Sequence, residues 1–171
     1  MRRLRYQVAV SLDGFIAAAD GSFDWIPTDP DIGFDALSGQ FDTYLMGRGT
    51  YETSGAMLSG QRVVVASTTL DPAQHADVTI IGDNLAEHVA ALKAEPGKDI
   101  WLFGGGQLFR SLLAENLVDT VEPAIVPVLL GGGVAFLPDP AVRARLELTG
   151  HRVYERSGIV LLEYAVRPGS A

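Results

Sequence analysis

Three segments carry residues that could bind a charged ligand, and each lies where an apolar run gives way to a helical pattern. In residues 101–109, WLFGGGQLF, the apolar run stops at Gly104, Gly105 and Gly106. Because glycine has no Cβ, backbone N–H groups there can approach a ligand closely. A helix that begins directly afterwards adds unpaired N–H groups and a dipole that favours phosphate. The pattern predicts a phosphate-binding turn, although a tight strand-to-helix turn without a ligand also fits the triplet taken alone.

The second segment is residues 44–52, YLMGRGTYE, where an apolar run leads into a glycine, a cation and a hydroxyl. Arg48 could bind a phosphate through two N–H groups. Thr50 could cap a helix or donate to a phosphate oxygen. A capped helix with a surface arginine is the simpler alternative.

The third segment places Ser67 and Thr68 directly after the apolar run 63–66. Ligands of open α/β sheets bind at the carboxyl ends of the strands, so these hydroxyls could face one. Hydroxyl residues also end strands where no ligand binds, and the segment is weak by itself.

Other familiar chemical motifs do not match. The glycines lack the spacing of the dinucleotide fingerprint, and no Gly-Lys-Ser/Thr ending marks a P-loop. The chain has no cysteine, and His75, His88 and His151 are scattered without metal-ligand spacing. We therefore predict no metal site and no disulfide.

The elements that must position these residues follow from hydrophobic periodicity. Short apolar runs rich in β-branched residues predict strands at 4–10, 43–46, 63–66, 78–81 and 100–103. Helical patterns cover 29–37 weakly, begin after 47–50, and are clearer at 84–94, with Asn84 as N-cap, and at 107–115. Residues 118–128 are extended but of uncertain strand content, because Pro123 and Pro127 interrupt them. Residues 146–154 and 159–166 alternate apolar and polar positions around a turn at 156–158, which predicts a hairpin.

This order predicts an α/β fold: a mostly parallel central sheet flanked by helices, closed by a C-terminal antiparallel hairpin. No repeat or linker interrupts residues 1–171, so we expect a single domain. The irregular stretch 11–30 is long for a compact domain and is typical of a lid or binding loop.

The composition of the chain limits the classes of partner that it could bind. The formal net charge is −8 and the pI about 4.7, which argues against binding nucleic acid. The apolar run near the N-terminus is broken by Gln7, Ser11 and Asp13, so it is too short for a signal peptide or a membrane span. The absence of cysteine fits a reducing cytoplasm. We expect a cytoplasmic protein that binds a small molecule.

Two further segments complete a family pattern: residues 8–17, VAVSLDGFIA, and residues 126–133, VPVLLGGG. Together with the three segments above, and over nearly the whole chain, they resemble the dihydrofolate reductase superfamily. The Ser-Leu-Asp-Gly and 126–133 segments resemble its riboflavin-biosynthesis reductase branch, including stand-alone bacterial members. The resemblance implies the dihydrofolate reductase-like fold, NADPH as cofactor, and a reductase similar to 5-amino-6-(5-phosphoribosylamino)uracil reductase, with its substrate unknown.

The resemblance also implies roles for individual positions, including a cis peptide between Gly104 and Gly105. Many relatives carry arginine where this chain has Gln107, so Arg48 becomes the main cation for a 2′-phosphate, and a preference for NADPH over NADH is expected on that basis. The implied cofactor contacts are Gly47, Arg48 and Thr50 at the adenine-side phosphates, Ser67 and Thr68 at the 2′-phosphate or adenosine, Gly104, Gly105, Gly106, Gln107 and Leu108 at the pyrophosphate, and Ala9 and Ile16 at the nicotinamide.

Candidates on the substrate side are fewer. Asp13 adjoins the expected nicotinamide edge and is the predicted catalytic carboxylate, although Asp-Gly is also an ordinary turn pair. Trp25 is a predicted wall for a flat heterocycle, or a core tryptophan. Asp35, like Asp31, could bind the substrate, or could simply favour the start of a helix.

Two other functions remain open from the sequence. A true dihydrofolate reductase would carry a pterin-binding carboxylate on its first helix, and no residue here aligns with one. A nucleotide-binding or dimeric protein without activity could keep the same fold. Members of the branch are commonly homodimers, and the apolar segment 126–136 is a candidate contact or a wall of the substrate pocket.

Overall fold

The computed structural model describes residues 1–58, 60–140 and 142–167. Its strands are β1 (Leu4–Ser11), β2 (Phe15–Ala17), β3 (Phe41–Gly47), β4 (Arg62–Ala66), β5 (Thr79–Ile81), β6 (Asp99–Gly104), β7 (Thr120–Val126), β8 (Val134–Ala135), β9 (Arg145–Tyr154) and β10 (Ile159–Arg167). Its helices are α1 (Phe34–Ser38), α2 (Arg48–Ser54), α3 (Leu85–Ala94) and α4 (Gly106–Ala114), with 3-10 turns η1 (Gly55–Leu58) and η2 (Pro72–Gln74). Within the described ranges, none of the helices combines the length and apolar character needed to cross a membrane.

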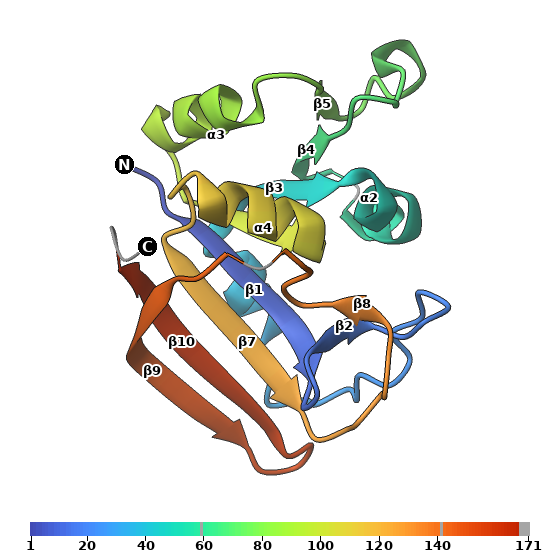
Figure 1. The fold of residues 1–171 in the computed structure, drawn as a ribbon, viewed down its shortest axis with the longest axis vertical. Coiled ribbons are helices and arrows are strands. Elements are labelled where there is room, and N and C mark those ends of the chain that lie inside the picture. The colour runs from blue at the N-terminus through green and yellow to red at the C-terminus, as the bar shows by residue number, and fades with distance from the viewer. Residues whose placement is uncertain (59, 141, 168–171) are drawn as a thin grey trace.

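One eight-stranded sheet, in the order β5-β4-β3-β6-β1-β7-β10-β9, organises the chain, and β2 and β8 form a small second sheet (Figure 1). The strands from β5 to β7 in this order are parallel. The last two, β10 and β9, run antiparallel and form the C-terminal hairpin. The predicted mixed sheet and its closing hairpin are therefore confirmed.

Helices cover both faces of the parallel part of the sheet. On one face, α3 and α4 pack on a core in which Tyr6 of β1 stacks on Phe109 of α4, with ring centroids 3.9 Å apart. On the other face, Leu37 of α1 and Tyr51 of α2 pack against a second core around Trp101. Figure 1 shows α4 crossing in front of β1, so its N-terminus is carried toward the carboxyl ends of the strands.

Three elements differ from the sequence prediction. The 118–128 segment contains β7, an interior strand between β1 and β10, despite Pro123. In the register with β10, Val121 and Ala124 of β7 each have a direct partner, whereas Pro123, which lies between them, has none. The absence of a backbone N–H on Pro123 is therefore tolerated at this position. The helix expected over 29–37 is only the short α1, and β2 lies within the stretch expected to be irregular.

The start of α3 confirms the predicted N-cap position but not its mechanism. Asn84 precedes the helix in the left-handed conformation, with φ of 55°, and its side chain makes no capping hydrogen bond. Asparagine tolerates this conformation better than most residues, which explains the residue type without a cap.

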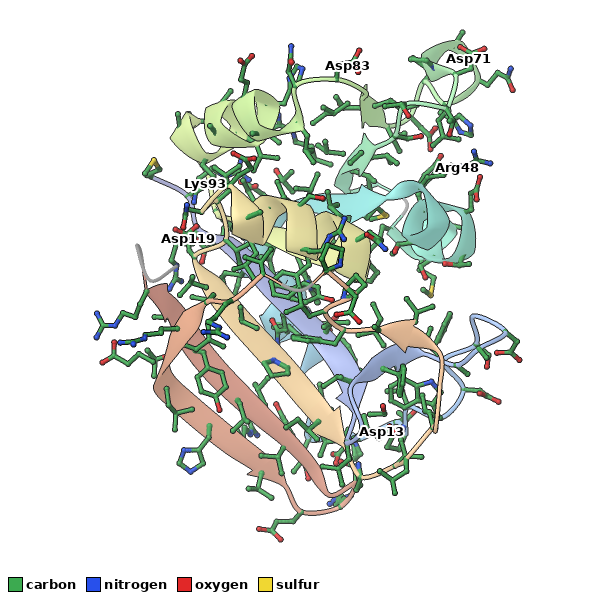
Figure 2. All side chains as sticks on the ribbon, viewed as in Figure 1. Asp13, Arg48, Asp71, Asp83, Lys93 and Asp119 are labelled. Atoms are coloured by element: carbon green, nitrogen blue, oxygen red, sulfur yellow. The ribbon has the colours of Figure 1, made fainter. Side chains whose placement is uncertain are left out.

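Ion pairs gather at the amino ends of the parallel strands, away from the proposed ligand edge. Arg2 pairs with Asp42, and its side chain is only 2% exposed. Lys93 of α3 lies 2.6 Å from Asp119, and Figure 2 shows these two side by side. Arg2 of the basic N-terminus is thus used for internal structure.

Candidate functional site

The site begins where two neighbouring strands separate. β1 pairs with β6 only from Leu4 to Tyr6, whose partner is Leu102. On its other side, β1 continues to pair with β7 as far as Ser11. The carboxyl ends of β1 and β6 therefore form a fork, and ligands of open α/β sheets bind where neighbouring strands part in this way.

The glycine junction at the end of β6 forms one side of this fork. A Cβ on Gly104, whose φ is +145°, would lie 3.2 Å from Thr50 Oγ1. A Cβ on Gly105 would lie 3.6 Å from the same hydroxyl and 4.0 Å from Ile16 Cδ1, and one on Gly47 would lie 4.0 Å from the Gly105 nitrogen. The structure thus brings these five predicted cofactor residues together, and the Gly104–Gly105 peptide is cis as expected.

The predicted cofactor residues at the start of α4 have different structural roles. Gly105 is the N-cap, with no side-chain capping bond, so the first N–H groups of the nine-residue helix have no side-chain acceptor there. A Cβ on Gly106 would overlap the Ala135 carbonyl oxygen, so this glycine is required by packing against β8. Leu108 is buried in the core and offers only its backbone, whereas Gln107 is exposed.

Arg48 is held across the ends of β3 and β4. Its Nε donates to Glu52 Oε1 at 2.7 Å, and its Nη1 donates to Thr69 Oγ1 at 2.8 Å. Ser67 Oγ in turn accepts from the backbone N–H groups of Thr69 and Leu70, at 3.2 and 3.1 Å. The predicted Arg48 and Ser67 are therefore neighbours, and the residue that links them is Thr69 rather than the exposed Thr68.

Comparison with known proteins agrees with this geometry. The family model of the RibD C-terminal domain matches residues 2–160. The chain belongs to this family. The Bacillus subtilis protein YyaP, which is uncharacterized, is 34% identical over 179 residues, covering 95% of this chain and 94% of that protein. The family predicted from the sequence is confirmed.

Solved structures confirm the fold. A candidate riboflavin biosynthesis protein from Shewanella sp. PV-4 superposes with a TM-score of 0.81 at 26% identity, covering 98% of this chain and 99% of that one. Dihydrofolate reductase from Enterococcus faecalis, complexed with NADP(H), superposes with a TM-score of 0.68 at 17% identity, covering 96% and 94%. The second likeness establishes the dihydrofolate reductase-like fold alone.

In this RibD C-terminal domain, Asp13 joins the two segments that marked the branch. Its carboxylate accepts from Ser11 Oγ at 2.6 Å, from the Leu130 N–H at 3.1 Å and from the Gly131 N–H at 2.7 Å. The Ser11 hydroxyl, followed by the N–H groups of Gly131 and Leu130, lowers the pKa of the Asp13 carboxyl. The ionised group accepts hydrogen bonds and has no proton to donate, so this geometry would suit a positioning role. The catalytic role expected for Asp13 stays a prediction.

The two predicted substrate-side residues lie in different surroundings. Trp25 is half-buried and packs in the same apolar cluster as Ala9, which places it on the β1 face that leads to the fork. Asp35 lies exposed in the first turn of α1.

The buried carboxylate of the 11–30 loop is Asp29, which the sequence analysis did not select. It is 2% exposed and accepts from the N–H groups of Asp31 and Ser157, at 2.9 and 3.1 Å. It therefore fastens this loop to the turn of the C-terminal hairpin. Sequence periodicity gave no signal for a contact between segments so far apart.

The Asp13 contacts predict a pH-dependent contribution to stability. A carboxyl whose pKa is lowered on folding stabilises the native state above its unfolded pKa of about 3.9, and this contribution is lost as the pH falls through the lower folded value. Asp13→Asn places an amide N–H against backbone donors, so its free energy of unfolding should be lower than that of the wild type at pH 7. The difference should shrink below about pH 4 in urea titrations followed by circular dichroism.

Asp24→Asn is the matched control, because Asp24 is exposed in the 11–30 loop. Its free energy of unfolding should follow the wild type across the same pH range. Equal stability of Asp13→Asn and the wild type at pH 7 would contradict the positioning role.

Proposed function

We propose that this chain is an NADPH-dependent oxidoreductase that reduces a heterocyclic substrate related to those of riboflavin biosynthesis. It would resemble 5-amino-6-(5-phosphoribosylamino)uracil reductase, with its own substrate still to be identified. The observation that carries the proposal is the meeting of Gly47, Thr50, Gly104, Gly105 and Ile16 at the fork between β1 and β6. Membership of the RibD C-terminal domain family supports a reductase.

The residues at the fork fit a dinucleotide. Any side chain on Gly104 or Gly105 would enter the space next to Thr50 and Ile16, so the backbone there stays open to a ligand. The N–H groups at the start of α4 suit a pyrophosphate, with Gln107 and Leu108 contributing through the backbone. Arg48, beside Ser67 and the adjacent Thr68, suits the 2′-phosphate or adenosine end.

The reaction demands positioning more than acid–base chemistry from the chain. The chemistry that NADPH supplies when bound is hydride transfer. Ala9 and Ile16 would hold the nicotinamide end in the fork, and Trp25 would form a wall for the substrate ring. Asp13 would keep the 126–133 segment in place beside them through its bonds to Leu130 and Gly131.

Arg48→Ala should weaken NADPH binding by at least about tenfold, because charge-assisted hydrogen bonds to a phosphate are lost. Binding of NADH, which lacks the 2′-phosphate, should change less. Calorimetric titration with both nucleotides measures the two effects. Arg62→Ala is the control, since Arg62 pairs with Glu95 at the amino end of β4, the opposite edge of the sheet. Failure of the wild type to bind either nucleotide would sink the proposal.

Gly47→Ala tests whether the fork itself holds the ligand. Gly47 has an ordinary extended conformation, and a Cβ there would touch only the Gly105 nitrogen, at 4.0 Å. The variant should therefore keep the melting temperature of the wild type while losing several-fold in NADPH affinity. Gly33→Ala, at the start of α1, serves as control because its Cβ would meet only Ala36 at 3.7 Å. Unchanged NADPH affinity in Gly47→Ala would place the nucleotide elsewhere.

The proposal includes a cytoplasmic homodimer. The lack of cysteine supports a reducing compartment. Leu129 and Val134 are 70% and 45% exposed in the segment expected to form a contact, and exposed apolar side chains of this kind support an interface.

Sedimentation velocity should give the wild type twice the mass of one chain. Leu129→Glu combined with Val134→Glu should shift it to the monomer, because charges would be buried in the interface. Met57→Glu, at another exposed apolar position in η1, should leave the dimer intact. A monomeric wild type would rule out the homodimer.

A further inference from the structure

Arg48 is already bonded to an anion of its own chain. Its Nε donates to Oε1 of Glu52, one turn further along α2, at 2.7 Å. A guanidinium binds a carboxylate and a phosphate in the same way, through N–H groups that lie parallel on one edge. The Glu52 carboxylate therefore takes a hydrogen bond that a phosphate oxygen would need in order to bind that edge of Arg48 fully.

This ion pair does little to hold the fold together. The side chains of Arg48 and Glu52 are 50% and 48% exposed, and exposed pairs four residues apart on a helix add little stability because solvent screens them. Arg48 has another anchor, since its Nη1 donates to Thr69 Oγ1 at 2.8 Å. The Thr69 N–H in turn donates to Ser67 Oγ at 3.2 Å. The charge of Glu52 therefore acts on what binds Arg48 more than on the fold.

The pair lies at the edge of the sheet where the proposed cofactor binds. Arg48 directly follows Gly47, and a Cβ on Gly47 would lie 4.0 Å from the Gly105 nitrogen at the fork. Figure 2 shows Arg48 between α2 and the loop after β4 that carries Asp71. A phosphate that reached Arg48 at this corner would come close to the carboxylate of Glu52, because both anions would be bonded to one guanidinium.

Basic side chains of the neighbouring elements are engaged elsewhere. Arg62 of β4 pairs with Glu95 at 2.6 Å, at the amino end of that strand. Nδ1 of His75, in the loop after β4, shares a hydrogen bond of 3.2 Å with the Tyr51 hydroxyl. When a phosphate binds at this corner, the single charge of Arg48 is therefore divided between two anions.

We infer that Glu52 sets the nucleotide preference of this chain by competing with the 2′-phosphate of NADPH for Arg48. The inference rests on the proposed reductase function and concerns the adenosine end of its cofactor. Two like charges held on one guanidinium repel each other, so Glu52 lowers the affinity for NADPH. NADH carries a 2′-hydroxyl instead, from which a carboxylate can accept a hydrogen bond. The preference for NADPH expected from Arg48 alone is thereby reduced.

Glu52→Gln removes the charge and keeps an oxygen that can accept from Arg48 Nε. In calorimetric titrations it should bind NADPH at least about fivefold more tightly than the wild type, because the repulsion is lost. Its affinity for NADH should change by less than about twofold, since no phosphate meets the carboxylate. The gain for NADPH should shrink at high salt, which screens exposed charges. The melting temperature should match that of the wild type.

Glu95→Gln is the matched control. It removes the same charge from the chain at an exposed carboxylate that pairs with Arg62, on the opposite edge of the sheet, so it should bind both nucleotides as the wild type does. An equal gain in this variant would assign the effect to net charge and overturn the inference. So would weaker NADPH binding in Glu52→Gln, an unchanged ratio of its two affinities, a gain that high salt does not reduce, or a marked fall in its melting temperature.

The two proposals fail separately. If the wild type binds both nucleotides and Glu52→Gln leaves the ratio of affinities unchanged, the cofactor assignment stands and the role of Glu52 falls. If the wild type binds neither nucleotide and Glu52→Gln binds NADPH, the role of Glu52 stands and the wild type is no NADPH-dependent enzyme. If neither protein binds a nucleotide, both proposals fall.

Discussion

The lack of side chains at the end of β6 is the constraint on which the rest of the site depends. The Gly104–Gly106 turn passes between Thr50 of α2 on one side and the chain after β8 on the other. A Cβ on Gly104 would press on Thr50 Oγ1, and one on Gly106 would overlap the Ala135 carbonyl. Only with this turn can α4 start where it does and bury Leu108 and Phe109 against β1. The same turn leaves the fork between β1 and β6 open.

The basic side chains at the two edges of the sheet differ in their burial. At the amino edge, Arg2, Arg5 and Lys93 are buried in ion pairs with carboxylates, so their charges are neutralised within the fold. At the carboxyl edge, Arg48 pairs with Glu52 but is half-exposed, and α4 presents N–H groups without a side-chain cap. In a chain with a net charge of −8, an anionic ligand would have to be attracted by local groups rather than by the overall field.

The features of the fold that depend on local sequence pattern could be predicted from the sequence. Apolar runs located the parallel strands, and glycine punctuation located the turns that meet at the fork. It could not predict that β7 is interior despite Pro123, because that depends on the register with β10. Contacts between distant segments, such as Asp13 with Gly131 or Asp29 with Ser157, left no periodic signal. Gln7 did leave one, as a polar residue interrupting a buried strand, but only the fold shows that its side-chain Oε1 is buried without a hydrogen-bond partner.

The glycine triplet shows why neither sequence nor fold alone assigns a substrate. Gly106 is required by packing, whereas Gly104 and Gly105 face Thr50 and Ile16, and the letters GGG do not distinguish the two reasons. The proposed cofactor side is built largely from backbone, which substitutions alter little. The proposed substrate side is built from side chains, Trp25 among them, which single substitutions change completely. A family built in this way can retain one cofactor while its members differ in substrate, so the substrate must be inferred from the β1 face of each member.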